Sequence, residues 1–180
     1  MNRLLAFGLF ASSLFAQDQV QINSPYVATP APVVDAMLSL ARAGQSDVVY
    51  DLGCGDGRII IQAAKRFGAH GVGIDNNPER IREAQENARR EGVANLVEFR
   101  IGDLYDANVG KATVVALYLL PDVNLRLRGK LKAQLKPGAR VVSHTFDMGD
   151  WKPNKEQTVA GEKIYLWKIR RKFLFFAYLL

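Results

Sequence analysis

Short apolar runs alternate with amphipathic segments along most of this chain. Four apolar runs and one alternating segment have the character of strands, and strands are expected over residues 47–52, 71–74, 96–101, 112–119 and 139–146. Apolar residues at helical spacing, bounded by Pro or Gly, predict helices over residues 31–43, 58–67, 78–90 and 122–135. Two later runs, over residues 156–160 and 163–169, predict a hairpin. This order indicates an α/β fold with a doubly wound, mainly parallel sheet, to which the hairpin adds an antiparallel strand.

The two ends of the chain do not fit this alternation. A basic start leads into the apolar stretch LLAFGLFASSLFA and then into polar residues, which predicts a signal peptide or a membrane anchor over residues 1–16, with an N-terminal helix as the alternative. The protein would then be exported or membrane-associated, and otherwise cytoplasmic. An N-terminal segment with a helix is expected over residues 17–46, the main domain over residues 47–170, and an apolar tail over residues 171–180.

Composition narrows the picture in three ways. A chain of 180 residues that is 48% hydrophobic has the size and core of about one soluble domain. The net charge of +6 suits nucleic acid, an anionic membrane surface or plain solubility, and does not separate them. The single cysteine, Cys54, excludes an internal disulfide, and the two histidines, His70 and His144, lie too far apart in sequence to suggest a metal-ligand cluster.

A glycine-rich turn follows the first predicted strand and opens a helix. It reads Asp51-Leu52-Gly53-Cys54-Gly55-Asp56-Gly57. Glycines permit a tight turn and close approach of a ligand to the backbone, and the helix that follows offers unpaired N–H groups. Gly53, Gly55 and Gly57 are therefore cofactor-binding candidates.

Acidic residues follow the next two strands. Asp75, with Asn76 beside it, ends the second strand at the distance at which a carboxylate accepts hydrogen bonds from both hydroxyls of a ribose. The alternative role for Asp75 is a helix cap. Asp103 follows the third strand, where its carboxylate would accept from an adenine amine while Leu104 packs on the ring; its alternative role is to form a turn.

The glycine spacing separates two cofactors. Dinucleotide-binding turns carry G-x-G-x-x-G, whereas this turn is G-x-G-x-G with Arg58 at the sixth position. The carboxylate of Asp51 at the strand end would repel a pyrophosphate but suits the α-amino group of S-adenosylmethionine (SAM). SAM is therefore the expected cofactor.

In combination, DLGCGDG, GID at 73–75 and GDL at 102–104 resemble the motifs of class I SAM-dependent methyltransferases. This resemblance implies a Rossmann-like, seven-stranded sheet whose last strand is reversed. The segments PYVATP, LYLLPDVN, RVVSHTF and YLW resemble a narrower group, which includes archaeal protein-lysine methyltransferases and the mitochondrial enzyme that modifies a lysine of the ATP synthase c subunit. The resemblance implies that Tyr26 and Thr29 line the cofactor site.

The substrate is expected at the end of the fourth strand. Enzymes that methylate planar amines often carry an Asn/Asp-Pro-Pro-aromatic motif there, whereas this chain has LLPD. Tyr118 and Asn124 are catalytic candidates that would orient an amine, with strand packing and a helix start as their alternative roles. The chain is short and has no large cap, which favours an open site and a protein lysine as acceptor. RNA or a small molecule as substrate, and a non-catalytic SAM-binding module, are the alternatives.

Overall fold

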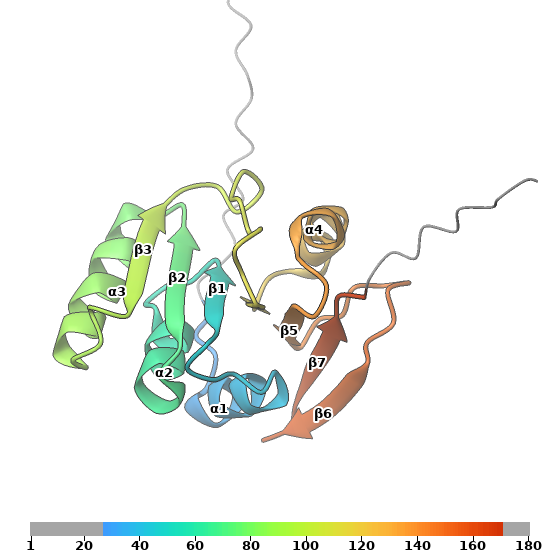
Figure 1. Cartoon of the computed structure of the whole chain (residues 1–180), viewed down its shortest axis with the longest axis horizontal. Helices are drawn as coiled ribbons and strands as arrows, with labels where there is room; N and C mark the ends of the chain where they lie inside the picture. Colours follow the sequence, from blue (N-terminus) through green and yellow to red (C-terminus); the bar gives the residue numbers. More distant parts are fainter. Residues whose placement is uncertain (1–26, 171–180) are drawn as a thin grey trace, which may run out of the picture.

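The computed structural model describes residues 27–170, which form four helices around one sheet (Figure 1). The helices are α1 (Ala31–Leu40), α2 (Arg58–Phe67), α3 (Pro78–Arg90) and α4 (Pro121–Gln134). The strands are β1 (Val48–Leu52), β2 (His70–Asp75), β3 (Val97–Ile101), β4 (Val114–Leu117), β5 (Arg140–His144), β6 (Lys155–Val159) and β7 (Glu162–Lys168). Every predicted element is present.

The strands pair in the order β3-β2-β1-β4-β5-β7-β6. Strands β1 to β5 are parallel, and β7 is antiparallel to β5, with Arg140 opposite Lys168 and His144 opposite Ile164. Strand β6 completes the hairpin with β7 and forms one edge of the sheet, while β3 forms the other. The predicted seven-stranded, mostly parallel sheet with a reversed C-terminal strand is confirmed.

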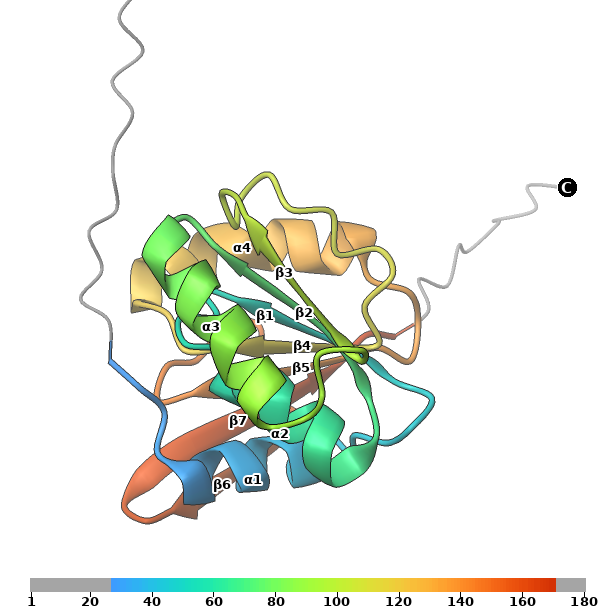
Figure 2. The ribbon, with the colours of Figure 1, turned by 90° about the vertical axis from the view of Figure 1, so that its left-hand side faces the viewer.

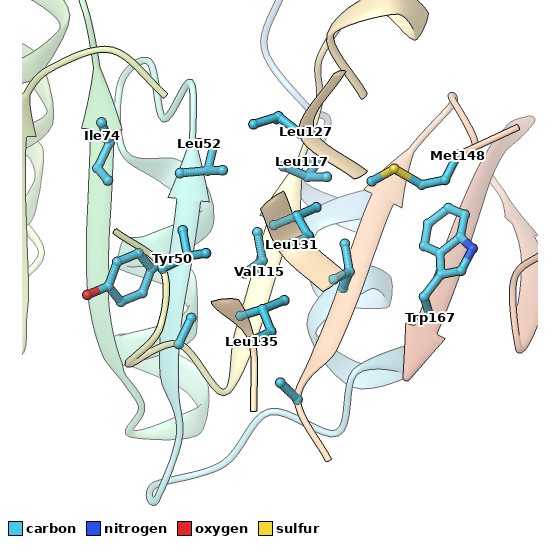
Figure 3. Close-up of a cluster of buried hydrophobic side chains, with 14 of the residues drawn as sticks. Tyr50, Leu52, Ile74, Val115, Leu117, Leu127, Leu131, Leu135, Met148 and Trp167 are labelled. Carbon is cyan, nitrogen blue, oxygen red and sulfur yellow. The ribbon is translucent and has the colours of Figure 1, made fainter. Parts of the chain in front are cut away.

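Alternation along the strands divides the core into two faces. Helices α1, α2 and α3 cover one face, where Val49, Ala116 and Val142 point. Figure 2 views the sheet with α3 in front and α4 behind. On the other face, the α4 residues Leu127 and Leu131 belong to one buried cluster with strand residues such as Val115, Leu117 and Trp167 (Figure 3).

The fourth strand is shorter than the apolar run that predicted it. The run spans residues 112–119, but the strand ends at Leu117. Leu119 lies beneath the glycine turn, because a Cβ added to Gly53 would come within 2.9 Å of its Cδ2. Tyr118 and Leu119 therefore belong to the loop at the carboxyl edge of the sheet, where ligands bind in this class of fold.

Helix α2 approaches β2 so closely that Gly71 has no room for a side chain. A Cβ there would lie 2.2 Å from Cγ2 of the buried Ile60. We expect Gly71→Ala to lower the free energy of unfolding by about 1–3 kcal/mol, because the added methyl overpacks the interface. Gly44→Ala is the matched control, because a Cβ added there would meet no atom within 4 Å among the described residues other than its chain neighbours. Its effect should stay within about 0.5 kcal/mol. Urea denaturation measures both, and equal midpoints for the two variants would contradict this packing.

Several expectations concern residues that the structure does not describe. The signal peptide or membrane anchor over residues 1–16, the candidate Tyr26 and the apolar tail over residues 171–180 lie outside the described residues. Within residues 27–170, no helix is both long and apolar enough to cross a membrane.

Candidate active site

The glycine turn joins β1 to α2 at the carboxyl edge of the sheet. The N–H groups of Gly53 and Cys54 donate to the carbonyl of Ile74 at 2.8 and 3.0 Å, which fixes the turn beside the end of β2. Gly53 and Gly57 have φ values of +81° and +80°, a region that L side chains rarely adopt. At Gly57, a Cβ would also lie 2.7 Å from the ring of Phe99. Glycine is thus required both by the backbone and by the packing.

Asp51 is a buried carboxyl group at the floor of this site. It lies in β1 between Gly73 and Ala116 and is 2% exposed. Burial first, and then the negative charges of Asp75 and Asp56, together raise its pKa to about 8. A cation placed against this group would restore its charge and offset the cost of burial.

Neighbouring Cys54 responds to the same surroundings. Burial and the charge of Asp51 raise the pKa of the Cys54 thiol well above its ordinary range. The thiol therefore stays protonated, and it is a poor nucleophile.

Asp75 lies at the end of β2 and bridges two loops. Its Oδ2 accepts a hydrogen bond from the N–H of Gly55 at 2.9 Å, and its Oδ1 accepts from the N–H of Asn77 at 2.9 Å. The cap of α3 is Asn77, whose side chain accepts from the N–H of Glu79. Asp75 is therefore not the helix cap that was the alternative role. Asn76 beside it is exposed.

Asp103 lies on the exposed loop after β3, next to the end of β2. The N–H of Gly102 donates to the carbonyl of Asp75 at 3.0 Å, which brings this loop to the site. Oδ1 of Asp103 accepts from the N–H of Tyr105 at 2.7 Å, so the turn-forming role exists and uses one carboxylate oxygen. Leu104 is half-buried against the α4 side of the core.

Thr29 reaches the same edge from the segment before α1. Its carbonyl accepts a hydrogen bond from Nη1 of Arg58 at 3.0 Å, and Arg58 itself pairs with Asp56 of the glycine turn. The side chain of Thr29 is 3% exposed. The structure thus brings Thr29, the glycine turn, Asp51 and Asp75 together.

The two catalytic candidates differ in their surroundings. Tyr118 is half-buried, and its ring centroid lies 4.0 Å from that of His144. Asn124 is fully buried in α4, and its amide donates to Oγ of Ser143 and to the carbonyl of Phe146, each at 3.2 Å. Asn124 therefore holds the loop after β5, whereas Tyr118 is partly exposed at the carboxyl edge of the sheet.

Each basic residue of α4 contacts another part of the chain. The guanidinium of Arg126 lies 4.0 Å from the ring centroid of Tyr105, and Nζ of Lys132 lies 4.7 Å from that of Trp151. Nη1 of Arg128 donates to the carbonyl of Met148 at 3.2 Å and also pairs with Asp150. Lys130 donates to the carbonyls of Leu104 and Tyr105. These cations fasten α4 to its neighbouring loops.

The sequence analysis did not identify His144 as a residue that contacts two of the site candidates. It lies within contact of Thr29 and Tyr118, residues that are far from it in sequence. The signal was present in the strand ends: because Leu117 pairs with Ser143 in the parallel sheet, residues 118 and 144 are neighbours.

These residues fit SAM. The glycine turn follows a strand at the carboxyl edge of the sheet, and Asp75 offers a carboxylate beside it. Asp51 is a buried carboxyl group whose charge needs a cationic partner, and the α-amino group of SAM is one. No group of three or more His, Cys, Asp or Glu residues in the described part of the chain is placed to hold a metal ion.

Comparisons with known proteins agree with this site. Residues 51–155 match the model of the ANTKMT methyltransferase domain. A protein-lysine N-methyltransferase of Saccharolobus islandicus (strain REY15A) is 46% identical over 150 residues, which cover 81% of this chain and 93% of that protein. A lysine N-methyltransferase of Xenopus laevis, named for the c subunit of ATP synthase, is 31% identical over 84% of this chain, which spans 66% of that protein's length.

A similar solved structure holds a ligand derived from SAM. The crystal structure of an RNA methyltransferase from Salinibacter ruber, in complex with S-adenosyl-L-homocysteine (SAH), has a TM-score of 0.80 and 54% sequence identity, over 81% of this chain and 95% of that one. The cofactor prediction is confirmed. This chain belongs to the ANTKMT methyltransferase domain family and is a SAM-dependent methyltransferase.

Proposed function

We propose that this enzyme methylates the side-chain amine of a protein lysine. The observation that carries the proposal is the negative charge around the carboxyl edge of the sheet, where the site lies. An aspartate lies at or shortly after the carboxyl end of each of the five parallel strands: Asp51 is buried at the floor of the site, and Asp75, Asp103, Asp122 and Asp147 form its rim. Asp122 and Asp147 are exposed and follow β4 and β5, the strands that end beside Tyr118. Such a rim attracts an ammonium group and repels phosphates.

The charge on α4 supports the same acceptor. A protein that follows an RNA backbone needs cations that are available to phosphates. Two of the four basic side chains of α4, Arg128 and Lys130, are half-buried and donate to carbonyls of the same chain. Of the four, only Arg126 and Lys132, which lie against aromatic rings, are exposed. The relative from Saccharolobus islandicus, named a protein-lysine N-methyltransferase, points in the same direction.

RNA methylation is the second candidate function. One observation favours it: the similar Salinibacter ruber protein is named an RNA methyltransferase. The two candidate functions need opposite charge at the rim, because exposed carboxylates that help a lysine to enter would oppose the approach of a nucleic acid.

Methyl transfer requires the acceptor amine to be neutral and aligned. When bound, SAM supplies a methyl group on a sulfonium, which a nucleophile takes by in-line displacement. Asp51, Asp75 and the glycine turn would hold the cofactor. A lysine has an ordinary pKa of about 10.4, and contact with half-buried Tyr118 and Leu119 would favour loss of its proton to water, because desolvation disfavours the charged amine. The rim carboxylates would then act at the encounter, before the amine is desolvated.

Labelled SAM and a cell lysate test the proposed acceptor. After incubation with the full chain, we expect label that is removed by protease, resists nuclease and is recovered as methyl-lysine after acid hydrolysis. An Asp51→Asn variant, which should not bind the cofactor, is the matched control and should give only background label. Label that survives protease and disappears with nuclease would establish RNA as the acceptor and overturn the proposal.

A further inference from the structure

His144 is a buried histidine at the carboxyl end of β5, next to Tyr118 of the candidate active site. It is 1% exposed. Its chain neighbour Ser143 pairs with Leu117, so His144 lies beside the loop that carries Tyr118. A polar ring at this depth needs partners, because burial without them costs free energy.

Side chains from three other parts of the chain surround the imidazole. The ring of Tyr118 lies tilted over it, with centroids 4.0 Å apart and planes at 38°. Nδ1 lies 3.4 Å from Oγ1 of Thr29. Nε2 lies 3.7 Å from Oε2 of Glu162 on β7 and has no hydrogen-bond partner among residues 27–170. His144 therefore touches the substrate side, the segment before α1 and the C-terminal hairpin at once.

The backbone holds His144 in place by a strained turn. Thr145, the next residue, has a φ of +64°, which is unusual for a β-branched residue. Its N–H donates to the carbonyl of Lys163 at 2.7 Å, and its hydroxyl donates to Glu162 at 3.1 Å. Strain of this kind persists where surrounding contacts over-determine the conformation, and it is concentrated at functional sites.

We propose that His144 is a positioning residue, which in its neutral form holds the ring of Tyr118 against the acceptor and joins it to Thr29 on the cofactor side. Burial lowers the pKa of His144, although the charge of Glu162 opposes this shift. Glu162 from β7 and the phenol of Tyr118 are the titratable groups that face the imidazole, and Arg58 reaches the same region through the carbonyl of Thr29. A proton on the imidazole would place a charge beneath Tyr118 and draw Nε2 toward Glu162.

This inference rests on methyl transfer and on Tyr118 facing the acceptor, but not on the acceptor being a lysine. Its test counts label in lysate macromolecules of every kind, so that an RNA acceptor would refute the proposed function and leave this inference open to its own test. The readouts are the titration of His144, the affinity for SAH and the pH profile of label transfer.

Nuclear magnetic resonance can follow His144 directly, because the chain contains two histidines. His70→Asn removes the exposed one at the start of β2 and assigns the signals. His144 should titrate below the ordinary histidine value of about 6.5. Glu162→Gln removes the negative charge, keeps an acceptor for the hydroxyl of Thr145, and should lower the pKa of His144 further.

Rates of label transfer at saturating SAM test the positioning role. His144→Ala should lower the rate at least about tenfold, because the acceptor is held less well, while SAH affinity by calorimetry stays within about twofold of wild type. The wild-type rate should fall at low pH with a midpoint at the pKa of His144. Glu162→Gln should shift that midpoint and the pKa of His144 to lower pH by the same amount. His70→Asn should change neither.

Glu162→Gln keeps the test decisive if His144→Ala fails to fold, because the Glu162 side chain is 46% exposed. If Glu162→Gln shifts the pKa of His144 but leaves the low-pH midpoint of the rate unchanged, His144 does not position the acceptor. A folded His144→Ala variant with the wild-type rate overturns the inference as well.

Discussion

Replacing Asp51 with asparagine should abolish cofactor binding and, at alkaline pH, stabilise the empty protein. In the fold the pKa of Asp51 is about 8, against an ordinary value of 3.8. A carboxyl group with a raised pKa contributes stability at low pH that is lost as the pH rises toward its folded-state value. Asparagine carries no such charge, so the variant avoids the loss.

The expected effects are large in both directions. Between pH 5.5 and 8.5 the wild type should lose about 3 kcal/mol of unfolding free energy that Asp51→Asn keeps. This difference corresponds to about 5–10 °C in melting temperature. Its affinity for SAH should fall at least about 100-fold, because the ammonium group would lose its charged partner. Thermal melts at the two pH values and calorimetry measure these changes.

Wild type gives an internal check on the same group. At pH 7 a carboxyl with a pKa of about 8 is largely protonated, so pairing with an ammonium must release most of one proton, which calorimetry in two buffers detects. Normal SAH binding by Asp51→Asn would show that another group holds the amine. A lower melting temperature of the variant at pH 8.5 would show that Asp51 carries no burial cost.

Asp75→Ala should remove SAH binding while the protein stays folded. The ribose would lose two charge-assisted hydrogen bonds to the carboxylate, each about 1.5–3 kcal/mol, and this loss should lower affinity at least about 100-fold. The side chain lies at the end of β2 and is only partly buried, so circular dichroism should remain unchanged.

Asn77→Ala is the matched control for this effect. It removes the cap of α3 two residues away, at a cost of about 1 kcal/mol of stability, yet should leave SAH affinity unchanged. Asp75→Asn retains an acceptor for the N–H of Gly55 and should bind SAH more weakly than wild type. Equal affinities of Asp75→Ala and wild type would contradict the ribose assignment.

The sequence predicted the elements well where single residues determine their ends. Helix α2 begins and ends between Gly57 and Gly68, both with positive φ, and its predicted range was correct. Pro78 likewise marks the start of α3. The run over residues 112–119 predicted a strand that is too long, because apolar residues pack equally well in a strand and beneath a glycine turn.

The places of the cofactor-binding candidates at the carboxyl edge were predictable, and the surroundings of the substrate-side candidates were less so. The aspartates that follow successive strands and the glycine turn lie in local motifs, whose place at the carboxyl edge follows from the topology. The surroundings of His144, Asn124 and the α4 cations depend on contacts between distant segments. Hydrophobic patterning carries no information on such contacts, and the sequence therefore left the roles of these side chains open.

The two outer strands of the sheet have a consequence for self-association. Strand β6 begins with Lys155 and Glu156 and is mostly exposed, and β3 carries the ion pair between Glu98 and Arg100. Charged side chains on an edge strand disfavour its pairing with a strand from another molecule. The open sheet can therefore keep its carboxyl edge available to a macromolecular substrate without offering its sides as templates for aggregation.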